Sequence, residues 1–339
     1  MLHNHQCRIP EFENDSVLLQ GSLSAKRDKR AAAMISTLKS LVEPLAETEF
    51  LTLLRERKLT FLRGCGSGRL ETLLNWEVLN HLLDSATLPL DALQVLRESV
   101  PIPTNFYLKE GRVDSAALSK LLDQGISLIF NRLEEYVPAL RALCRNIERK
   151  TSERVAAAAI MTSGRGGALK CHYDAEDLVI LQIANTKRWQ VFNSPVINPV
   201  PGVAKRPPPE DLTPVFNQVL QPGDFLFLPA GHWHHCENGP HRSLHASIIF
   251  VPPNGRSLMK ALVSQLSSDE TFRRPLTRHN SLDALASHEA ALKARLVDTI
   301  RALSLNRFLR ERAALHPVEG IQLEGQTHQA HHVQAASQT

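Results

Sequence analysis

The chain has 339 residues, 43% of them hydrophobic and 22% charged, with a formal net charge of +4. This is the composition of a globular protein, and so small a charge gives no strong nucleic-acid signal. No apolar run approaches the roughly 20 residues of a membrane helix, and the N-terminus lacks the apolar core of a signal peptide. The five cysteines form no C-x-x-C pair, which fits reduced thiols. We therefore expect a cytoplasmic protein without membrane association.

Apolar residues at helical spacing dominate the first 150 residues, after a lead of 25 residues without periodicity. The spacing predicts helices over Ala31–Leu54, Leu70–Leu83, Pro89–Leu96, residues 115–123 and Glu134–Lys150. Asp114 or Ser115 is placed to cap the fourth of these helices. Two short apolar runs, Lys58–Leu62 and Ser127–Asn131, predict strands between them.

From residue 154 the spacing changes to that of strands. Short apolar segments separated by turn residues lie at 155–162, 168–172, 178–183, 188–192, 215–220, 225–228 and 244–251. Many short strands at regular spacing predict a β-sandwich or barrel, with the jelly roll as a candidate. Ser194–Pro209 contains six prolines and predicts a loop. Leu258–Arg312 returns to helical spacing, and the polar segment Gln322–Thr339 predicts a disordered tail.

The most informative pattern is His172-Tyr173-Asp174, followed about sixty positions later by His234 at the end of a second run, Gly223–His234, next to His235. Two histidines and one carboxylate hold non-haem Fe(II) and leave three positions open for a co-substrate and O2. On a strand, residues i and i+2 point to the same side, so His172 and Asp174 can both reach one metal. The third ligand has to come from elsewhere in the fold, and the candidates in and next to the second run are His232, His234 and His235.

The runs His172–Pro195 and Leu220–Phe250 resemble the JmjC-type, cupin-like oxygenases, in particular the ribosomal-protein hydroxylases. The resemblance implies a fold that is mainly β with helical additions, built on a double-stranded β-helix (jelly-roll) core. It also implies that Fe(II) is bound by His172, Asp174 and His234. The family places its distal ligand three residues after the glycine, which selects His234 and leaves His235 as the second choice.

The resemblance further implies a site for 2-oxoglutarate. Lys187, thirteen residues after Asp174, falls where the family carries a cation that pairs with the far carboxylate of this co-substrate. Such a cation is needed because a buried carboxylate left unpaired would cost several kcal/mol. His245 and Ser247 match a family run whose inward groups line the same pocket, and plain core packing is the alternative for both.

One departure from the family concerns the strand before the H-x-D motif. That strand usually carries an Asn and a Tyr, and the Tyr helps to hold 2-oxoglutarate. Here the equivalent positions are Ala158, Ala159 and Ile160, without a phenol. Thr162 or Ser163 is the expected substitute, with an altered grip on the co-substrate.

We therefore expect a 2-oxoglutarate-dependent dioxygenase with Fe(II) as cofactor, which hydroxylates a protein, peptide or amino-acid side chain and releases succinate and CO2. The alternative is a non-enzymatic, metal-binding cupin with a regulatory or ligand-binding role. The expected organisation has four parts: N-terminal, mostly helical elements at 1–99, the catalytic jelly roll at 100–252, a helical subdomain at 253–315 and a tail at 316–339. The helical subdomain has amphipathic spacing, and the resemblance implies a homodimer formed through it.

Two further features favour simple interpretations. Gly64–Gly68 is rich in glycine but lacks the spacing and the following βαβ unit of a phosphate loop, so we expect a flexible turn. The histidines near the C-terminus, His328, His331 and His332, are expected to belong to a solvated tail.

Overall fold

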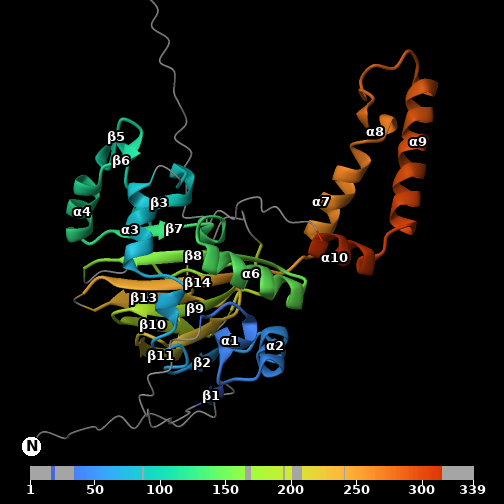
Figure 1. Ribbon diagram of the computed structural model, residues 1–339. Helices are drawn as coiled ribbons and strands as arrows, with labels where there is room; N and C mark the ends of the chain where they lie inside the picture. Colours follow the sequence, from blue (N-terminus) through green and yellow to red (C-terminus); the bar gives the residue numbers. More distant parts are fainter. Residues whose placement is uncertain are drawn as a thin grey trace, which may run out of the picture. The chain divides into compact units, whose positions relative to one another are not determined.

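The computed structural model describes residues 17–19 and 34–314, except for 86–87, 165–168, 194, 201–207 and 240. The predicted tail, most of the predicted lead and about half of the proline-rich loop lie outside the described residues. Within the described residues the chain forms two compact units, one from residues up to 147 together with 155–250, the other from 148–154 and 251–314. The sheets belong to the first unit, and helices α7 to α10 belong to the second (Figure 1).

A large, mostly antiparallel sheet forms the framework of the first unit (Figure 1). Its strands lie in the order β1 (Val17–Leu19), β2 (Thr60–Leu62), β12 (Phe225–Leu228), β9 (Asp177–Ala184), β14 (Ser243–Val251), β8 (Arg154–Thr162), β7 (Ser127–Phe130), β3 (Leu93–Arg97) and β4 (Val100–Pro101). Strands from the first hundred residues thus extend a sheet whose centre comes from residues 154–251. The central strands are buried on both faces, which explains why their sequences read as continuous apolar runs.

A second sheet faces this framework. It has the order β11 (Pro214–Leu220), β10 (Lys187–Phe192) and β13 (His234–Asn238), and all its pairs are antiparallel. Lys187 on β10 donates a hydrogen bond to Thr162 on β8 across the interior, at 2.9 Å, so the two sheets enclose a common core. The predicted jelly roll with helical additions is therefore confirmed.

The opposite face of the large sheet is covered by helices of the first unit. On β14, Leu244, Ala246, Ile248 and Phe250 alternate toward this side and join one apolar cluster with residues of α1 (Leu38–Val42), α2 (Glu47–Glu56) and α6 (Pro138–Thr151). Phe50 of α2 meets Phe225 and Phe227 of β12 edge-on, with ring centroids 5.8 and 5.7 Å apart. The intervening residues of the same strands face the second sheet, and they carry the polar groups described below.

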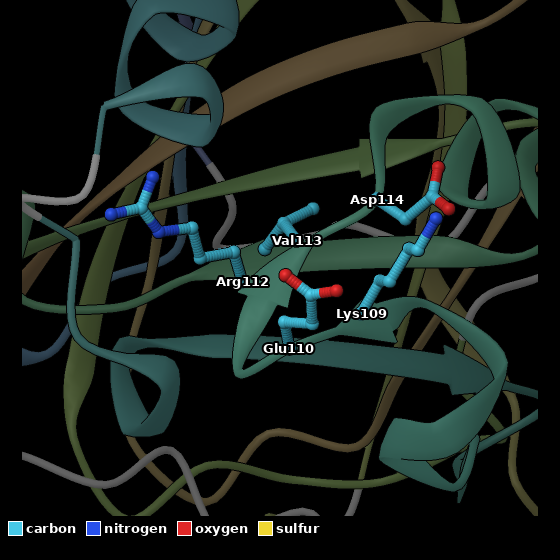
Figure 2. A pocket seen from close by; sticks show the side chains of 5 residues that line it. All are labelled: Lys109, Glu110, Arg112, Val113 and Asp114. Carbon is cyan, nitrogen blue, oxygen red and sulfur yellow. The ribbon is translucent and has the colours of Figure 1, made fainter.

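The remaining short elements of the first unit surround this framework. They are η1 (Leu70–Thr72), α3 (Trp76–Asp84), η2 (Leu90–Ala92), η3 (Thr104–Phe106), the hairpin β5 (Leu108–Lys109) and β6 (Arg112–Val113), α4 (Ser115–Asp123) and α5 (Leu133–Tyr136). Of the two predicted capping residues, Asp114 caps α4, and its side chain accepts hydrogen bonds from the amides of Ala116 and Ala117 at 3.0 Å. The hairpin lines an open surface hollow formed by Lys109, Glu110, Arg112, Val113 and Asp114, which contains none of the predicted site residues (Figure 2).

Several predicted elements differ in the structure. The predicted helices Leu70–Leu83 and Glu134–Lys150 are each divided in two, because Asn75 caps a new helix, α3, and Pro138 begins another, α6. The predicted helix Pro89–Leu96 is only a short 3-10 turn followed by strand β3, because Leu93 and Val95 point into the core with the period of a strand. The predicted helix Ala31–Leu54 is divided into α1 and α2, with Pro44 between them. His172 pairs with His234 as an isolated bridge, and its described neighbours 169–171 form no strand.

The second unit is helical, as the spacing of Leu258–Arg312 predicts. It contains α7 (Gly255–Leu266), α8 (Glu270–Arg273), α9 (Leu282–Arg301) and α10 (Leu305–Ala314). Asn254 and Ser281 cap α7 and α9 by accepting from backbone amides three residues ahead, at 3.1 Å each. None of the helices in the described part of the chain is both long and apolar enough to cross a membrane.

Candidate metal centre

Backbone hydrogen bonds join the two histidine-bearing segments. The His172 amide donates to the His234 carbonyl at 3.1 Å, and the His234 amide donates back to the His172 carbonyl at 2.7 Å. A third bond runs from the Gly231 amide to the Asp174 carbonyl at 2.8 Å. These bonds bring the H-x-D motif and the distal run together although neither His172 nor Asp174 lies in a continuous strand.

The side chains of His172, Asp174 and His234 converge. Their potential ligand atoms all lie within 4.8 Å of one another, and they are the one such group of three or more among the described residues. The Nε2 atoms of His234 and His172 lie 3.5 and 3.9 Å from the two carboxylate oxygens of Asp174. The His234 side chain is 3% exposed, whereas those of His172 and Asp174 are 20% and 19% exposed, so the group is partly open to solvent.

The outer nitrogens of both imidazoles are held by the backbone. His172 Nδ1 lies 2.7 Å from the Lys170 carbonyl oxygen, and His234 Nδ1 lies 3.0 Å from the His232 carbonyl oxygen. A carbonyl can only accept, so each Nδ1 carries the proton and each Nε2 presents its lone pair toward Asp174. This is the arrangement in which metal-binding histidines are fixed in proteins. The donor set of two imidazoles and one carboxylate fits Fe(II).

The two neighbouring histidines lie outside this group. His235 lies on β13 beside Gln190, and its Nε2 is 3.8 Å from a carboxylate oxygen of Glu237. His232 Nδ1 donates to the Pro229 carbonyl at 3.1 Å, and burial lowers the pKa of its imidazole. Of the three candidates for the distal ligand, the structure brings only His234 together with His172 and Asp174.

Lys187 is fully buried in the interior between the sheets. Its ammonium donates to Thr162 Oγ1 at 2.9 Å and lies 3.5 Å from His245 Nδ1. Among the described residues, no carboxylate forms an ion pair with it, and burial lowers its pKa. Burial, and then the nearby Lys187 charge, hold the pKa of His245 well below its usual range. The structure thus places Thr162, Lys187 and His245 in one cluster.

Several polar atoms around this cluster have no hydrogen-bond partner within the described part of the protein. They are Trp189 Nε1, Gln182 Oε1 and Ser127 Oγ. Trp189 shares the inward face of β10 with Lys187, while Gln182 lies opposite His245 and Ser127 lies opposite Thr162 in the large sheet. Buried polar atoms normally have a partner, so these three atoms are available to a polar ligand in this interior.

Trp189 connects the two groups of residues. Its ring stacks on His234, with centroids 5.8 Å apart, and meets His245 edge-on at 5.3 Å. Sequence reasoning passed over this tryptophan, although its position two residues after Lys187 on a predicted strand gives it the same face. Gln182 was also missed, because a single polar residue within an apolar strand gives no pattern that points to a site.

The remaining predicted pocket residues fall in different surroundings. Ser247 is 3% exposed on β14, opposite Ile180, on the same face as His245. Ile160, at the position of the family tyrosine, packs with Ile129 and with two leucines and offers no hydroxyl. Of the two expected substitutes, Thr162 contacts Lys187, whereas the Ser163 amide bonds to the Ile126 carbonyl at 3.1 Å, at the end of the strand.

The glycine-rich segment Gly64–Gly68 is occupied by contacts within the fold. The Gly64 amide donates to Asp224 Oδ1 at 2.7 Å, and the Gly66 amide donates to the Gly223 carbonyl at 2.9 Å. A side chain at Gly223, whose φ is +95°, would meet Ser67 at 2.5 Å. The segment therefore packs tightly against the turn before β12, which favours a structural role over phosphate binding.

Comparisons with known proteins agree with this fold. Residues 135–258 match the family model of the JmjC domain. The chain is 26% identical over 297 residues to the protein YxbC of Bacillus subtilis (strain 168), covering 81% of this chain and 89% of that protein. It is 29% identical over 143 residues to Ribosomal oxygenase 2 of Rattus norvegicus, covering 41% of this chain and 30% of that protein. It is 23% identical to the bifunctional lysine-specific demethylase and histidyl-hydroxylase NO66 of Drosophila grimshawi, covering 68% of this chain and 32% of that protein.

A solved structure shows the same fold. The crystal structure of Escherichia coli ycfD aligns with a TM-score of 0.51 at 16% sequence identity, covering 76% of this chain and 68% of that chain. The chain spans about a third of the length of NO66 and of Ribosomal oxygenase 2, so it matches them over part of their length only. The fold and the convergent side chains define a jelly-roll protein with a candidate metal centre, part of which matches the JmjC domain. Within that class, this chain resembles the ribosomal oxygenases.

Proposed function

We propose that this protein is a 2-oxoglutarate-dependent oxygenase that binds Fe(II) through His172, Asp174 and His234. The geometry supports this assignment because both imidazoles present Nε2 toward the carboxylate and their Nδ1 atoms are already bonded. When bound, the iron supplies the redox chemistry that couples oxidation of the substrate to conversion of 2-oxoglutarate and O2 into succinate and CO2. The chain's own contribution is to hold the ligands and to shape the cavity.

The single observation that carries the proposal is the buried Lys187 ammonium without a carboxylate partner among the described residues. A buried cation is costly unless a counter-charge accompanies it. Lys187 lies in the same interior as the three proposed metal ligands, and Trp189 bridges the two places. An anionic co-substrate that reaches from the metal to Lys187 would bind the metal at one end and supply the counter-charge for Lys187 at the other. 2-Oxoglutarate has a carboxylate at each end and meets both requirements.

Thr162 and His245 complete the proposed site for the far carboxylate. The Thr162 hydroxyl accepts from Lys187, so its own proton is free to donate to the carboxylate. His245 and Ser247 belong to the lining of the pocket on β14. This assignment replaces the missing tyrosine at Ile160 with a threonine on the same strand, two residues further along.

The proposed reaction is hydroxylation of a side chain of a protein, a peptide or an amino acid. The names of the relatives support a protein substrate: NO66 is a histidyl-hydroxylase and a lysine-specific demethylase, and Ribosomal oxygenase 2 is named for the ribosome. The Escherichia coli ribosomal oxygenase YcfD, which aligns with a TM-score of 0.51, has been solved with cobalt and succinic acid. Cobalt is a divalent metal that can take the place of Fe(II), and succinate is the product formed from 2-oxoglutarate.

The organisation is also part of the proposal. Residues 1–99 support the catalytic jelly roll of 100–252, and 253–315 form a helical dimerisation subdomain of a cytoplasmic protein. The second unit exposes several large apolar side chains, among them Met259, Val263, Leu282 and Ile300. An isologous pairing of such helices would bury them. Light scattering on the purified chain tests this directly, with a dimer as the expected result and a monomer as the result against it.

A non-enzymatic cupin is the second candidate, and the loss of the family tyrosine at Ile160 favours it. The experiment that separates the two is release of succinate from 2-oxoglutarate by the full chain, with Fe(II) and without it. We expect slow, Fe(II)-dependent release even without a prime substrate, and none from Asp174→Ala. No release above that of Asp174→Ala, although 2-oxoglutarate binds, would favour the regulatory cupin.

A further inference from the structure

The β3–β4 hairpin contacts the segment that precedes the proposed metal ligand His172. The hairpin lies at the edge of the large sheet, and its two strands are joined by only two residues, Glu98 and Ser99. Ser99 Oγ accepts a hydrogen bond of 2.8 Å from the amide of Lys170, which is 71 residues away in the chain. This hairpin precedes the residues that match the JmjC model, so the match alone does not reveal the contact.

The same Lys170 peptide segment continues the contact to the imidazole. The carbonyl oxygen of Lys170 accepts from His172 Nδ1 at 2.7 Å. Ser99 and the His172 ring are therefore bonded to the same residue, Ser99 to the amide of Lys170 and the imidazole to its carbonyl, with one Cα between the two groups. Residues 169–171 form no strand that would hold this backbone in place by itself. The Ser99 hydroxyl thus holds this backbone from one side, in addition to the bridge between His172 and His234.

The backbone of the hairpin supports a specific role for Ser99. Glu98 and Ser99 both have positive φ angles, 48° and 70°. Two-residue hairpins with this conformation favour Asn and Gly at these positions, because other side chains are strained there. A serine at the second position adds strain without helping the turn. Strained residues that persist tend to serve a function, and here the hydroxyl is the group that makes the long-range contact.

We infer that Ser99 is a positioning residue for the metal centre: its hydroxyl holds the backbone of Lys170 at the amide, and the carbonyl of the same residue, on the other side of the Cα, orients His172 with Nε2 toward Asp174. The inference rests on the proposed function, because it treats His172 as a metal ligand. Partners that orient a metal-binding histidine typically change metal affinity by about 10-fold to 100-fold. Since Ser99 acts on His172 only through the backbone of Lys170, we expect the lower end of this range, a change in metal affinity of about 10-fold.

The test measures Co(II) binding to the full-length chain, by titration and by the visible spectrum of the bound Co(II), rather than turnover. Ser99→Ala removes the hydroxyl and should weaken binding about 10-fold, with an altered Co(II) spectrum. Ser99→Gly also removes it but relieves the positive φ. It should bind as weakly as Ser99→Ala while its melting temperature does not fall. Ser99→Asn keeps an acceptor and tolerates a left-handed backbone, so it should restore the wild-type affinity and spectrum.

Glu98→Ala is the matched control, because it changes the exposed neighbour in the same turn and should leave Co(II) affinity unchanged. Wild-type affinity and spectrum in Ser99→Gly would overturn the inference, and so would an equal loss in Ser99→Ala and Glu98→Ala. Either result would leave the proposed function intact, provided that wild type binds Co(II) and His172→Ala does not. No Co(II) binding by the wild type would instead contradict the proposed function itself.

Discussion

The interior of the jelly roll has two polar ends that differ in how their side chains are satisfied. At one end, His172 and His234 each bond a backbone carbonyl through Nδ1, and their segments are joined by backbone bonds. At the other end, Lys187 is buried without a carboxylate partner among the described residues, and nearby Trp189 and Gln182 have polar atoms without hydrogen-bond partners there. The first end is organised by the protein alone, while the second needs a ligand to satisfy it.

This difference has a consequence for stability as well as for binding. Removing a metal-ligand side chain from the first end should weaken metal binding, while Lys187 and Thr162, the proposed partners of the far carboxylate, stay in place. Removing Lys187 should not lower the stability of the fold, because it removes a buried cation, but it should lower the affinity for 2-oxoglutarate. Opposite effects on stability and on ligand affinity are characteristic of a group that is placed for binding.

The largest expected effect is at the metal end. His172→Ala, Asp174→Ala and His234→Ala should each abolish tight Co(II) or Fe(II) binding and turnover, because each removes one of the three proposed protein ligands. His235→Ala is the matched control, since His235 is adjacent in sequence but pairs with Glu237. Isothermal titration with Co(II) and the succinate assay measure both. Full activity in His234→Ala together with loss in His235→Ala would show that the distal ligand is His235.

The next effect is at Lys187. Lys187→Ala should raise the KM for 2-oxoglutarate by about 100-fold, for about 3 kcal/mol of lost ion pairing and hydrogen bonding. Co(II) affinity should barely change, because Lys187 lies among Thr162 and His245 rather than at the three ligands. The melting temperature without ligand should not fall, but its rise on adding 2-oxoglutarate should disappear.

Arg188→Ala provides the control for this variant, because Arg188 is exposed on the same strand and bonds Asn217 at 3.0 Å. It should leave the KM unchanged. A Lys187→Ala variant that melts far below wild type yet keeps its KM would show Lys187 to be structural and would remove the main argument for 2-oxoglutarate.

The smallest effect is at Thr162. Thr162→Val keeps the shape of the side chain but removes the hydroxyl, so the KM for 2-oxoglutarate should rise about fivefold, for about 1 kcal/mol of one hydrogen bond. Ser163→Ala tests the other candidate for the missing tyrosine and should have no effect, measured by the same succinate kinetics. The reverse order of the two variants would mean that Ser163 holds the co-substrate.

The sequence was sufficient to propose those residues of the candidate site that belong to a recognisable motif or alternate along one strand. His172, Asp174 and Lys187 could be singled out because their types and spacing match a known motif, and His245 and Ser247 because they alternate on one apolar strand. Strand β13 was not predicted, since His234–Asn238 is a polar run that becomes a strand only by pairing with β10. The contact of Ser99 with Lys170 needs the tertiary fold to bring together residues far apart in sequence.

The helix predicted at Pro89–Leu96 shows why short apolar runs are ambiguous. A leading proline and apolar residues at mixed spacing fit the first turn of a helix as well as a strand. The choice in favour of β3 comes from pairing with β7, where Leu93 lies opposite Phe130. That pairing also positions the hairpin that carries Ser99, so the error in the predicted element concealed a contact of the site.

The measurement that tests the central claim most directly is anaerobic addition of 2-oxoglutarate to the Fe(II)-loaded chain, followed by visible absorption. We predict a weak charge-transfer band in the wild type, none in Asp174→Ala, and a band in Lys187→Ala that needs about 100-fold more 2-oxoglutarate. No band in the wild type at any concentration, with Fe(II) bound, would contradict the account, because the metal end and the lysine end would then not share one ligand.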